Sequence, residues 1–318
     1  MKRIWRDADI DRSALDGKTV AIIGYGIQGR AQALNLRDSG IGVVVGGREK
    51  GRGVAAARQD GFEAFGIEEA VKRSQVVFLL TPDETHKELV EKVIAPMLGP
   101  GAALGFACGF SVRFSNLVFR KDTDVIMVSP KGPGKTLRER FEAGGGLPAL
   151  LAVHQDASAH ALQTALAYAG GIGSGRLAII ESTFAEEAET DLFGEQAVLC
   201  GGIPRLMEKG FELLVSKGYS PESAYIECIW EAKAIVDLIF ERGIDGMYAG
   251  ISPTARYGGL TRGPRLIDAE VEKKMTAVLD DIRSGQFAKE LASAPATTAK
   301  TGAGLRAAWR RLKEAFGG

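Results

Sequence analysis

The sequence predicts an α/β protein in which a doubly wound parallel sheet is followed by a domain made only of helices. Up to about residue 183, short apolar runs rich in β-branched residues alternate with longer helical patterns. These runs are apolar throughout rather than alternating, as strands of a parallel sheet covered on both faces should be. After that point the β signal disappears, and apolar residues recur at helical spacing.

The expected strands follow one another along the first part of the chain. They read, in order, TVAIIG, IGVVVGG, QVVFLL, AALGFA, DVIMVS, PALLAVH and LAIIEST. The alternation of such runs with helical segments favours a doubly wound sheet, in which helices cover both faces. We therefore expect residues 1–183 to form this domain.

The helical domain is expected over residues 184–295. Its helical patterns read PRLMEKGFELLVSKG, PESAYIECIWEAKAIVDLIFERG and DAEVEKKMTAVLDDIRSG. Residues 296–318, ATTAKTGAGLRAAWRRLKEAFGG, open as a linker of small residues and close as a short basic amphipathic helix. We expect this terminal helix to be loosely held rather than to bind a partner.

Charge and composition exclude several classes of function. The 318 residues carry 40 basic and 40 acidic side chains, so no net field steers the protein to nucleic acid or to an anionic membrane. No segment reads as a signal core or a membrane span, and we expect a cytoplasmic protein that acts on a small molecule. The cysteines, Cys108, Cys200 and Cys228, have no CxxC spacing, which excludes a zinc knuckle and a disulfide framework.

A glycine-rich loop predicts a dinucleotide site of the Rossmann type. Gly24, Gly26 and Gly29 form G-x-G-x-x-G between an expected strand and an expected helix. The first glycine permits the tight turn, the second lets the backbone approach a pyrophosphate, and the third allows helix and strand to pack closely. The helix N-terminus adds partial positive charge. The expected cofactor-binding residues of this loop are Gly24, Tyr25, Gly26, Ile27, Gln28 and Gly29.

The end of the second expected strand indicates which nicotinamide cofactor is bound. An NAD site usually has Asp or Glu there, to accept hydrogen bonds from the ribose. This chain has VVVGGREKGRG instead, so Arg48, Lys50 and Arg52 take the place of the acid. A cluster of cations suits a ribose phosphate and favours NADPH. The alternative is that these three basic residues form an ordinary solvated loop that binds no phosphate.

Two pairs of carboxylates lie four residues apart in the helical domain, Asp191 with Glu195 and Glu227 with Glu231. Four residues is a little more than one helical turn, so the members of a pair project from one face. A single pair is more typical of an exposed helix, but the second pair lies on a run so apolar that we expect it to be largely buried. Buried carboxylates need a compensating cation. Ligation by oxygen alone suits a hard cation such as magnesium.

Several motifs together make the sequence resemble the short, class I form of ketol-acid reductoisomerase. They are GYGIQG, SPKGPGKTLRERF, LLAVHQDAS, ETDLFGEQAVLCGG and AYIECIWEAKAIVDLI, and the resemblance runs from the first ten residues to about residue 290. It implies a Rossmann domain that binds NADPH and a helical domain that is folded through a backbone knot and shared by two subunits. A homodimer, or a higher assembly built from it, is therefore implied.

The resemblance also implies the active-site residues. A site for two magnesium ions would take an Asp and a Glu from one subunit and two Glu from its partner, and the matching positions are Asp191, Glu195, Glu227 and Glu231. Lys131 matches the active-site lysine, and Ser252 matches the serine that binds the substrate carboxylate. Gly134, in the PKGPG motif, is assigned to the cofactor.

The family's reaction belongs to branched-chain amino acid biosynthesis. An alkyl group of a 2-hydroxy-3-keto acid such as acetolactate migrates from the alcohol carbon to the neighbouring ketone carbon, and hydride from NADPH reduces the resulting ketone. Two divalent ions would acidify the hydroxyl and polarise the ketone. Lys131 would stabilise developing charge or relay a proton, and Glu231 would both bind metal and hydrogen-bond a substrate hydroxyl.

The sequence departs from the family pattern near the expected site. Cys108, which we count among the catalytic residues, stands where the family usually has histidine, as do Lys135 and Trp230, while Pro253 and Arg256 replace asparagine and glutamate. A buried thiol is a weak donor that cannot replace an imidazole, so we expect poor turnover of acetolactate. One alternative is a paralogous reductase or isomerase that acts on another keto or imine substrate in a specialised pathway. A second, an idle NADPH sensor, is disfavoured because the carboxylates and Lys131 are all retained.

Overall fold

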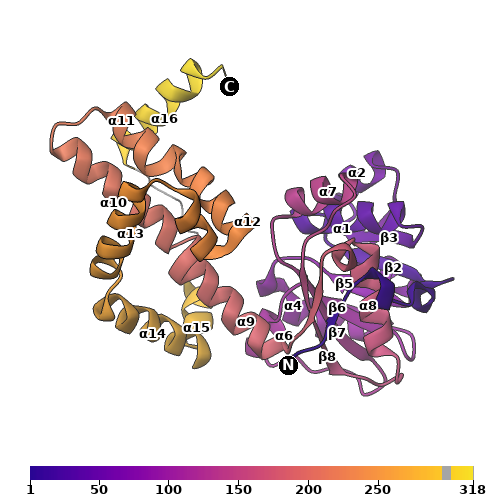
Figure 1. Cartoon of the computed structure of the whole chain (residues 1–318). Helices are drawn as coiled ribbons and strands as arrows, with labels where there is room; N and C mark the ends of the chain where they lie inside the picture. Colours follow the sequence, from indigo (N-terminus) through magenta and orange to yellow (C-terminus); the bar gives the residue numbers. More distant parts are fainter. Residues whose placement is uncertain (296–301, 318) are drawn as a thin grey trace. The chain divides into compact units, whose positions relative to one another are not determined.

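The computed structural model describes residues 1–295 and 302–317 of the chain (Figure 1). The chain divides into two compact units, Met1–Thr190 and Asp191–Gly318. The division falls within a single helix, α9 (Phe184–Phe193), so the chain passes from one unit to the other without an intervening loop. The first residues of the expected linker, 296–301, lie outside the described residues.

The first unit is built on one sheet. In the described residues this sheet has nine strands in the order β1-β9-β8-β7-β6-β5-β2-β3-β4. The strands are β1 (Ile4–Trp5), β2 (Thr19–Ile23), β3 (Gly42–Gly47), β4 (Glu63–Gly66), β5 (Val76–Leu79), β6 (Ala103–Phe106), β7 (Asp124–Pro130), β8 (Ala149–Gln155) and β9 (Ile179–Glu181). Each run that the sequence predicted to be a strand is one, and β1 and β4 are additional.

The order of the strands reverses at β2. This strand pairs in parallel with β3 on one side and with β5 on the other. In an open parallel sheet, ligands bind beyond the carboxyl ends of the strands at such a reversal. The loop that follows β2 carries the glycine motif, so the fold places this loop at the expected binding edge.

One pair of long strands in the sheet is antiparallel, which the sequence analysis did not anticipate. Helix α7 (Gly134–Glu142) follows β7, and the chain then turns back through glycines, with Gly144 in the left-handed region at φ 81°. It re-enters the sheet at the edge where β7 ended, so that Pro130 pairs with Ala149. A strand that starts at that edge must run in the opposite direction, and β7 and β8 are therefore antiparallel.

Helical segments cover both faces of the sheet, as the continuous apolar runs predicted. Besides α7 and α9 they are η1 (Asp7–Asp9), η2 (Arg12–Leu15), α1 (Ile27–Asp38), α2 (Arg52–Gln59), α3 (Ile67–Lys72), η3 (Asp83–Thr85), α4 (His86–Glu88), η4 (Leu89–Ile94), α5 (Ala95–Met97), α6 (Phe110–Phe114), α8 (Ala161–Gly171) and η5 (Ser174–Arg176). Val20 and Ile22 of β2 pack in one core cluster with Tyr168 of α8. Ala21 and Ile23 pack in the other, on the opposite face. The sheet is thus a buried layer between two layers of helices.

Every described element of the second unit is helical. After α9 come η6 (Gly194–Leu199), α10 (Gly202–Ser216), α11 (Pro221–Tyr225), η7 (Ile226–Trp230), α12 (Ala232–Gly250), α13 (Pro253–Leu266), α14 (Ala269–Arg283), α15 (Gln286–Ser293) and α16 (Ala303–Ala315). The segments η6 and η7 are π-helical, and α12 is interrupted at Gly243, where φ is 70°. The structure does not show the backbone knot, which stays a prediction.

The second unit exposes much of its apolar surface. The run that contains α12 was expected to be largely buried, and within the chain this expectation is wrong. Phe240 is 72% exposed, Ile244 63% and Val236 50%. The physical reason is that the buried apolar residues of this unit gather mainly under α10, α11 and α16, which leaves α12 uncovered. A large exposed apolar face marks a surface that another molecule covers.

Among the described residues, no helix combines the length and the apolar character that a membrane crossing requires.

Candidate active site

The glycine loop has the geometry that its sequence predicted. Gly24 has φ 99°, and a Cβ there would lie 2.8 Å from the backbone oxygen of Leu80. A Cβ on Gly29 would lie 2.0 Å from the backbone oxygen of Gly24, so α1 packs directly on the turn. A Cβ on Gly26 would meet nothing within 4 Å. The position that was expected to face a pyrophosphate therefore borders open space.

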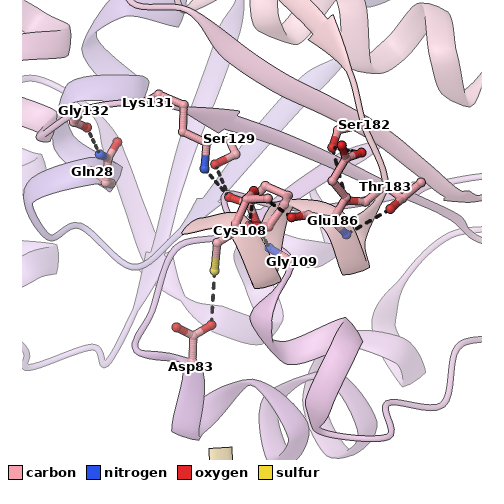
Figure 2. Close-up of polar contacts among 12 residues, drawn as sticks. Gln28, Asp83, Cys108, Gly109, Ser129, Lys131, Gly132, Ser182, Thr183 and Glu186 are labelled. Atoms are coloured by element: carbon pink, nitrogen blue, oxygen red, sulfur yellow. Dashed lines mark hydrogen bonds and ion pairs between the residues drawn. The ribbon is translucent and has the colours of Figure 1, made fainter. Parts of the chain in front are cut away.

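The glycine loop lies against the segment that follows β7 through one hydrogen bond and one close approach of the two backbones. The Gln28 side chain donates from Nε2 to the backbone oxygen of Gly132 at 2.9 Å (Figure 2). A Cβ on Gly134 would lie 2.3 Å from the backbone oxygen of Ile27, so the first turn of α7 touches the first turn of α1. The structure thus brings together the loop residues and Gly134, which were both expected at the cofactor.

Tyr25 has a structural role in this loop. Its hydroxyl donates to Oδ2 of Asp60 at 2.8 Å, and Arg30 also donates to Oδ2, at 2.6 Å. The Tyr25 ring meets that of Phe62 edge to face, with centroids 5.9 Å apart. Hydrogen bonding from Arg30 lowers the pKa of Asp60 from 3.8 to about 2. The side chain of Tyr25 is therefore occupied by contacts within the protein, and we expect only its backbone to contact a cofactor.

The three basic residues at the end of β3 are available to a ligand. Arg48 and Lys50 lie between β3 and α2, and Arg52 is the first residue of α2. All three are exposed. Among the described residues, none of these side chains has an ion pair or hydrogen bond that would occupy its charge. Exposed cations without an acidic partner are suited to bind a phosphate.

Lys131 lies in a cluster around a carboxylate that is fully buried, that of Glu187. Lys131 donates from Nζ to Oε1 of Glu187 at 2.5 Å, and Ser129 donates from Oγ to the same oxygen at 2.7 Å. The backbone N–H of Gly109 donates to Oε2 at 2.5 Å. Figure 2 shows Lys131, Ser129 and Gly109 directed toward this point. Three donors on one buried carboxylate hold the lysine head in a fixed position.

The sequence analysis missed Glu187, although a signal for it exists. Glu187 lies four residues before Asp191, as Asp191 lies four residues before Glu195. The spacing that singled out the expected metal ligands therefore extends one turn upstream on α9. Glu187 is 0% exposed, whereas its neighbour Glu186 is exposed and pairs with Lys2. The two glutamates differ in whether their side chains are buried, and this difference cannot be predicted from sequence spacing alone.

Cys108 is linked to a second small polar network. Its Sγ donates to Oδ1 of Asp83 at 3.5 Å (Figure 2). The Ser111 hydroxyl donates to the same oxygen at 2.9 Å. Ser111 also contacts Nδ1 of His86 at 2.7 Å. Burial, and then the charges of Asp83 and Glu187, raise the pKa of the Cys108 thiol well above its usual range. Cys108 is therefore a protonated thiol and a poor nucleophile.

His86 was expected at a helix start, and it is the first residue of α4. Its contact with Ser111 could not be predicted from the sequence, because the two residues are 25 positions apart. The ring is buried, its Nε2 lies 2.8 Å from the backbone oxygen of Thr81, and burial lowers its pKa. Because burial lowers its pKa, the ring is a neutral imidazole in contact with Ser111. Its Nδ1 lies 3.5 Å from Oδ1 of Asp83.

Two of the four expected metal ligands lie in helical turns of unusual geometry. Asp191 is in α9, Glu195 and Glu227 are in the π-helical η6 and η7, and Glu231 directly follows η7. π-helical turns are rare and are frequent at functional sites. Asp191 is half-buried and the three glutamates are exposed, so the expectation of buried carboxylates is wrong within the chain. The physical reason is that the apolar run that carries the second pair is itself exposed within the chain, with Phe240 72% exposed.

The described residues do not bring three of these acids together. No group of three or more His, Cys, Asp or Glu side chains in the described part of the chain is arranged to hold a metal ion. Their chemistry nevertheless fits magnesium, because all four are carboxylates and none is a softer nitrogen or sulfur donor.

Ser252 and Pro253 have a clear local structural role. Ser252 is the N-cap of α13, where its Oγ accepts from the backbone N–H of Ala255 at 3.2 Å. Pro253 occupies the first helical position, which proline favours because no intrahelical donor is lost there. Arg256 is exposed on the same helix. Lys135 is exposed on α7 and lies 3.6 Å from Glu139. These departures from the family pattern are thus compatible with helix starts and surfaces.

Two family models match the chain. One, described as acetohydroxy acid isomeroreductase, NADPH-binding domain, matches residues 14–178. The other, described as ketol-acid reductoisomerase, C-terminal domain, matches residues 184–315. Between them they span both units of the structure.

Similar proteins carry the same family name. A ketol-acid reductoisomerase (NADP(+)) of Pyrobaculum calidifontis is 54% identical over 290 residues, which are 91% of this chain and 88% of that protein. The corresponding protein of Pyrobaculum islandicum is 53% identical over the same shares of both chains. A solved structure of an NADH-preferring ketol-acid reductoisomerase from an uncultured archaeon has a TM-score of 0.88 and 42% identity, and covers 99% of this chain and 93% of that one. A more distant semialdehyde dehydrogenase NAD-binding protein from Cupriavidus necator, with a TM-score of 0.64 and 21% identity, shares the fold alone.

Proposed function

Because the chain belongs to the ketol-acid reductoisomerase family, we propose that it uses NADPH and Mg²⁺ to convert a 2-hydroxy-3-keto acid such as acetolactate, by alkyl migration and hydride reduction. The observation that carries this proposal is the match of both family domains over nearly the whole chain. The alternative, a paralogue with another keto or imine substrate, is not favoured, since relatives identical at more than half of the aligned positions are ketol-acid reductoisomerases.

The cofactor is proposed to bind at the glycine loop. The open space beside Gly26 and the N-terminus of α1 would receive the pyrophosphate. Arg48, Lys50 and Arg52 would pair with the ribose phosphate. Replacing these three residues with Ser, Gln and Ser is expected to weaken NADPH binding by at least tenfold while changing NADH binding much less. Fluorescence titration of both cofactors measures this ratio. An unchanged ratio would place the phosphate elsewhere.

The metal ions are proposed to bind Asp191 and Glu195 of one subunit together with Glu227 and Glu231 of a second subunit. When bound, magnesium lowers the pKa of the substrate hydroxyl and polarises the neighbouring carbonyl. The carboxylates of this chain orient the ions and balance their charge. Support for the division between subunits comes from the exposure of Glu227 and Glu231, which directly precede α12, a helix whose apolar residues are also exposed.

Lys131 is proposed to stabilise negative charge on the substrate and to donate a proton. Its ammonium group is held by Glu187, and the same carboxylate accepts from Gly109, next to Cys108. Glu187 is therefore a positioning residue, because it fixes Lys131 without being required to touch the substrate. Glu231 is proposed to hydrogen-bond a substrate hydroxyl and Ser252 to bind the substrate carboxylate.

A homodimer is proposed as the smallest active assembly. A second copy of the chain would cover the exposed residues of α12, among them Phe240 and Ile244. An apolar face of this kind is typical of obligate interfaces between subunits. Sedimentation velocity tests the assembly, and a stable monomer with full activity would contradict it.

The decisive experiment is a turnover assay. The purified protein is mixed with acetolactate, NADPH and Mg²⁺, and oxidation of NADPH is followed by absorbance. Because the relatives are ketol-acid reductoisomerases, we expect turnover in the ordinary range for enzymes, about ten per second, rather than the poor turnover that Cys108 predicted. Chelation of the metal should abolish it. Turnover lower by a factor of about a hundred would instead support the poor use of acetolactate that the replacement at Cys108 suggested.

A further inference from the structure

The terminal helix α16 is docked onto the second unit, although its sequence led us to expect a loosely held end. Its residues Leu305, Ala308 and Leu312 recur at helical spacing, and Ala308 is 1% exposed. They pack in one cluster with Phe211 of α10 and Tyr225 of α11, both buried. The helix therefore completes a core of the second unit rather than extending into solvent.

Polar and aromatic contacts fasten α16 along its length. At its start, the backbone N–H of Gly302 bonds to the carboxylate of Glu208 on α10. In its second half, Arg311 pairs with Glu222 of α11, with 2.6 Å between NH1 and Oε1. Just after its end, the ring of Phe316 lies 4.9 Å from that of Trp230, at an angle of 47°. Together with the apolar stripe, these contacts fix both the position and the rotation of the helix.

The helical turn whose Trp230 contacts Phe316 carries one expected metal ligand, and a second follows it. Trp230 is the last residue of η7, the π-helical turn that contains Glu227, and Glu231 follows it. Ile229 of the same turn packs against the cluster that α16 completes. Glu227 and Glu231 are exposed. The turn thus has apolar side chains held by α16 and carboxylates free to meet a ligand.

This arrangement matters because π-helical turns are rare and occur frequently at functional sites, so the contacts that hold such a turn bear on its function. Magnesium demands near-ideal octahedral coordination, so its affinity is sensitive to small displacements of its ligands. We propose that α16, through Phe316 on Trp230, is a positioning element that sets the carboxylates of Glu227 and Glu231 for magnesium. This inference rests on the proposed role of these two glutamates as ligands. It also gives Trp230 a structural purpose, as the docking site of the terminal helix.

The test compares single replacements in the full-length protein. Phe316→Ala removes the ring that contacts the half-exposed Trp230, and Phe316→Tyr keeps it. Trp309→Ala is the matched control, because Trp309 is an aromatic residue of α16 that is 47% exposed and contacts Lys313 of its own helix. Binding of Mg²⁺ to the NADPH-loaded protein is measured by calorimetry, and NADPH affinity is measured separately by fluorescence.

We expect Phe316→Ala to raise the dissociation constant for Mg²⁺ about threefold to tenfold, in line with the loss of an aromatic pair. NADPH affinity should stay unchanged, and Phe316→Tyr and Trp309→Ala should bind Mg²⁺ as the wild type does. Equal Mg²⁺ affinity in Phe316→Ala and Trp309→Ala would overturn the inference. Glu227→Gln separates this failure from failure of the proposed function: a normal Mg²⁺ affinity in Glu227→Gln would reject the ligand assignment itself, and with it the role of α16.

Discussion

At the scale of single residues, Glu187 is notable because its carboxylate is fully buried and accepts three hydrogen bonds. A buried charge is costly unless it is paired and hydrogen-bonded, and Glu187 satisfies this requirement through Lys131, Ser129 and Gly109. The donors come from two segments of the sheet unit, the end of β7 with Ser129 and Lys131, and the start of α6 with Gly109. One side chain therefore ties the helix that leads to Asp191 to the lysine of the proposed site.

Glu187→Gln is expected to lower kcat by about a hundredfold, because the amide keeps the shape but no longer holds the ammonium of Lys131 by charge. NADPH affinity should be retained, since the glycine loop does not contact Glu187. Steady-state kinetics and cofactor titration measure the two effects. Glu186→Gln is the control, as that exposed neighbour pairs with Lys2. Similar losses in both variants would show that the helix, rather than Glu187, is responsible.

Cys108 is expected to resist alkylation. Its thiol pKa is raised by burial and by the nearby carboxylates, so very little thiolate is present at neutral pH. With iodoacetamide at pH 7, Cys108 should react at least about tenfold more slowly than Cys200, which is exposed. Mass spectrometry of peptides at timed intervals measures both rates, and the denatured protein serves as the reference. Fast modification of Cys108 in the native protein would contradict a partly buried, protonated thiol.

At the scale of elements, the sequence predicted well those strands whose residues are apolar and β-branched. Apolar runs identified the strands from β2 to β9 apart from β4, whose EAFG lacks β-branched residues. The antiparallel direction of β8 was not predictable, because composition does not encode where a strand re-enters the sheet. The π-helical turns and the docking of α16 also depend on contacts between distant segments. The glycine loop was predicted in detail because its function depends on local backbone geometry.

Two glycines of that loop should respond differently to alanine. A Cβ on Gly26 meets no protein atom within 4 Å, so Gly26→Ala should fold normally and bind NADPH at least tenfold more weakly. A Cβ on Gly29 would lie 2.0 Å from the oxygen of Gly24, so Gly29→Ala should unfold at lower denaturant concentration, with a loss of about 1–3 kcal/mol. Urea unfolding and fluorescence titration distinguish the two outcomes. A stability loss in Gly26→Ala equal to that in Gly29→Ala would refute the distinction.

At the scale of the whole molecule, the candidate site raises a question of assembly. The acids that the sequence singled out are present, yet the described part of one chain does not gather three of them. The helical unit also leaves large apolar side chains of α12 exposed. The sequence indicated which residues could bind metal, through their spacing and type. It could not show that their helices remain uncovered, because periodicity reports an apolar face and not what covers it.

The last prediction tests directly whether each site draws its ligands from two subunits. In a hybrid dimer, one subunit carries Asp191→Asn and the other carries Glu227→Gln. If a site combines Asp191 of one subunit with Glu227 of the other, one of the two sites receives both changes and the second receives neither. Hybrids isolated with two different affinity tags should then show about half of the wild-type turnover, whereas each variant alone is inactive. If both ligands of a site came from the same subunit, every site would carry one change, and the hybrid would be as inactive as its parents.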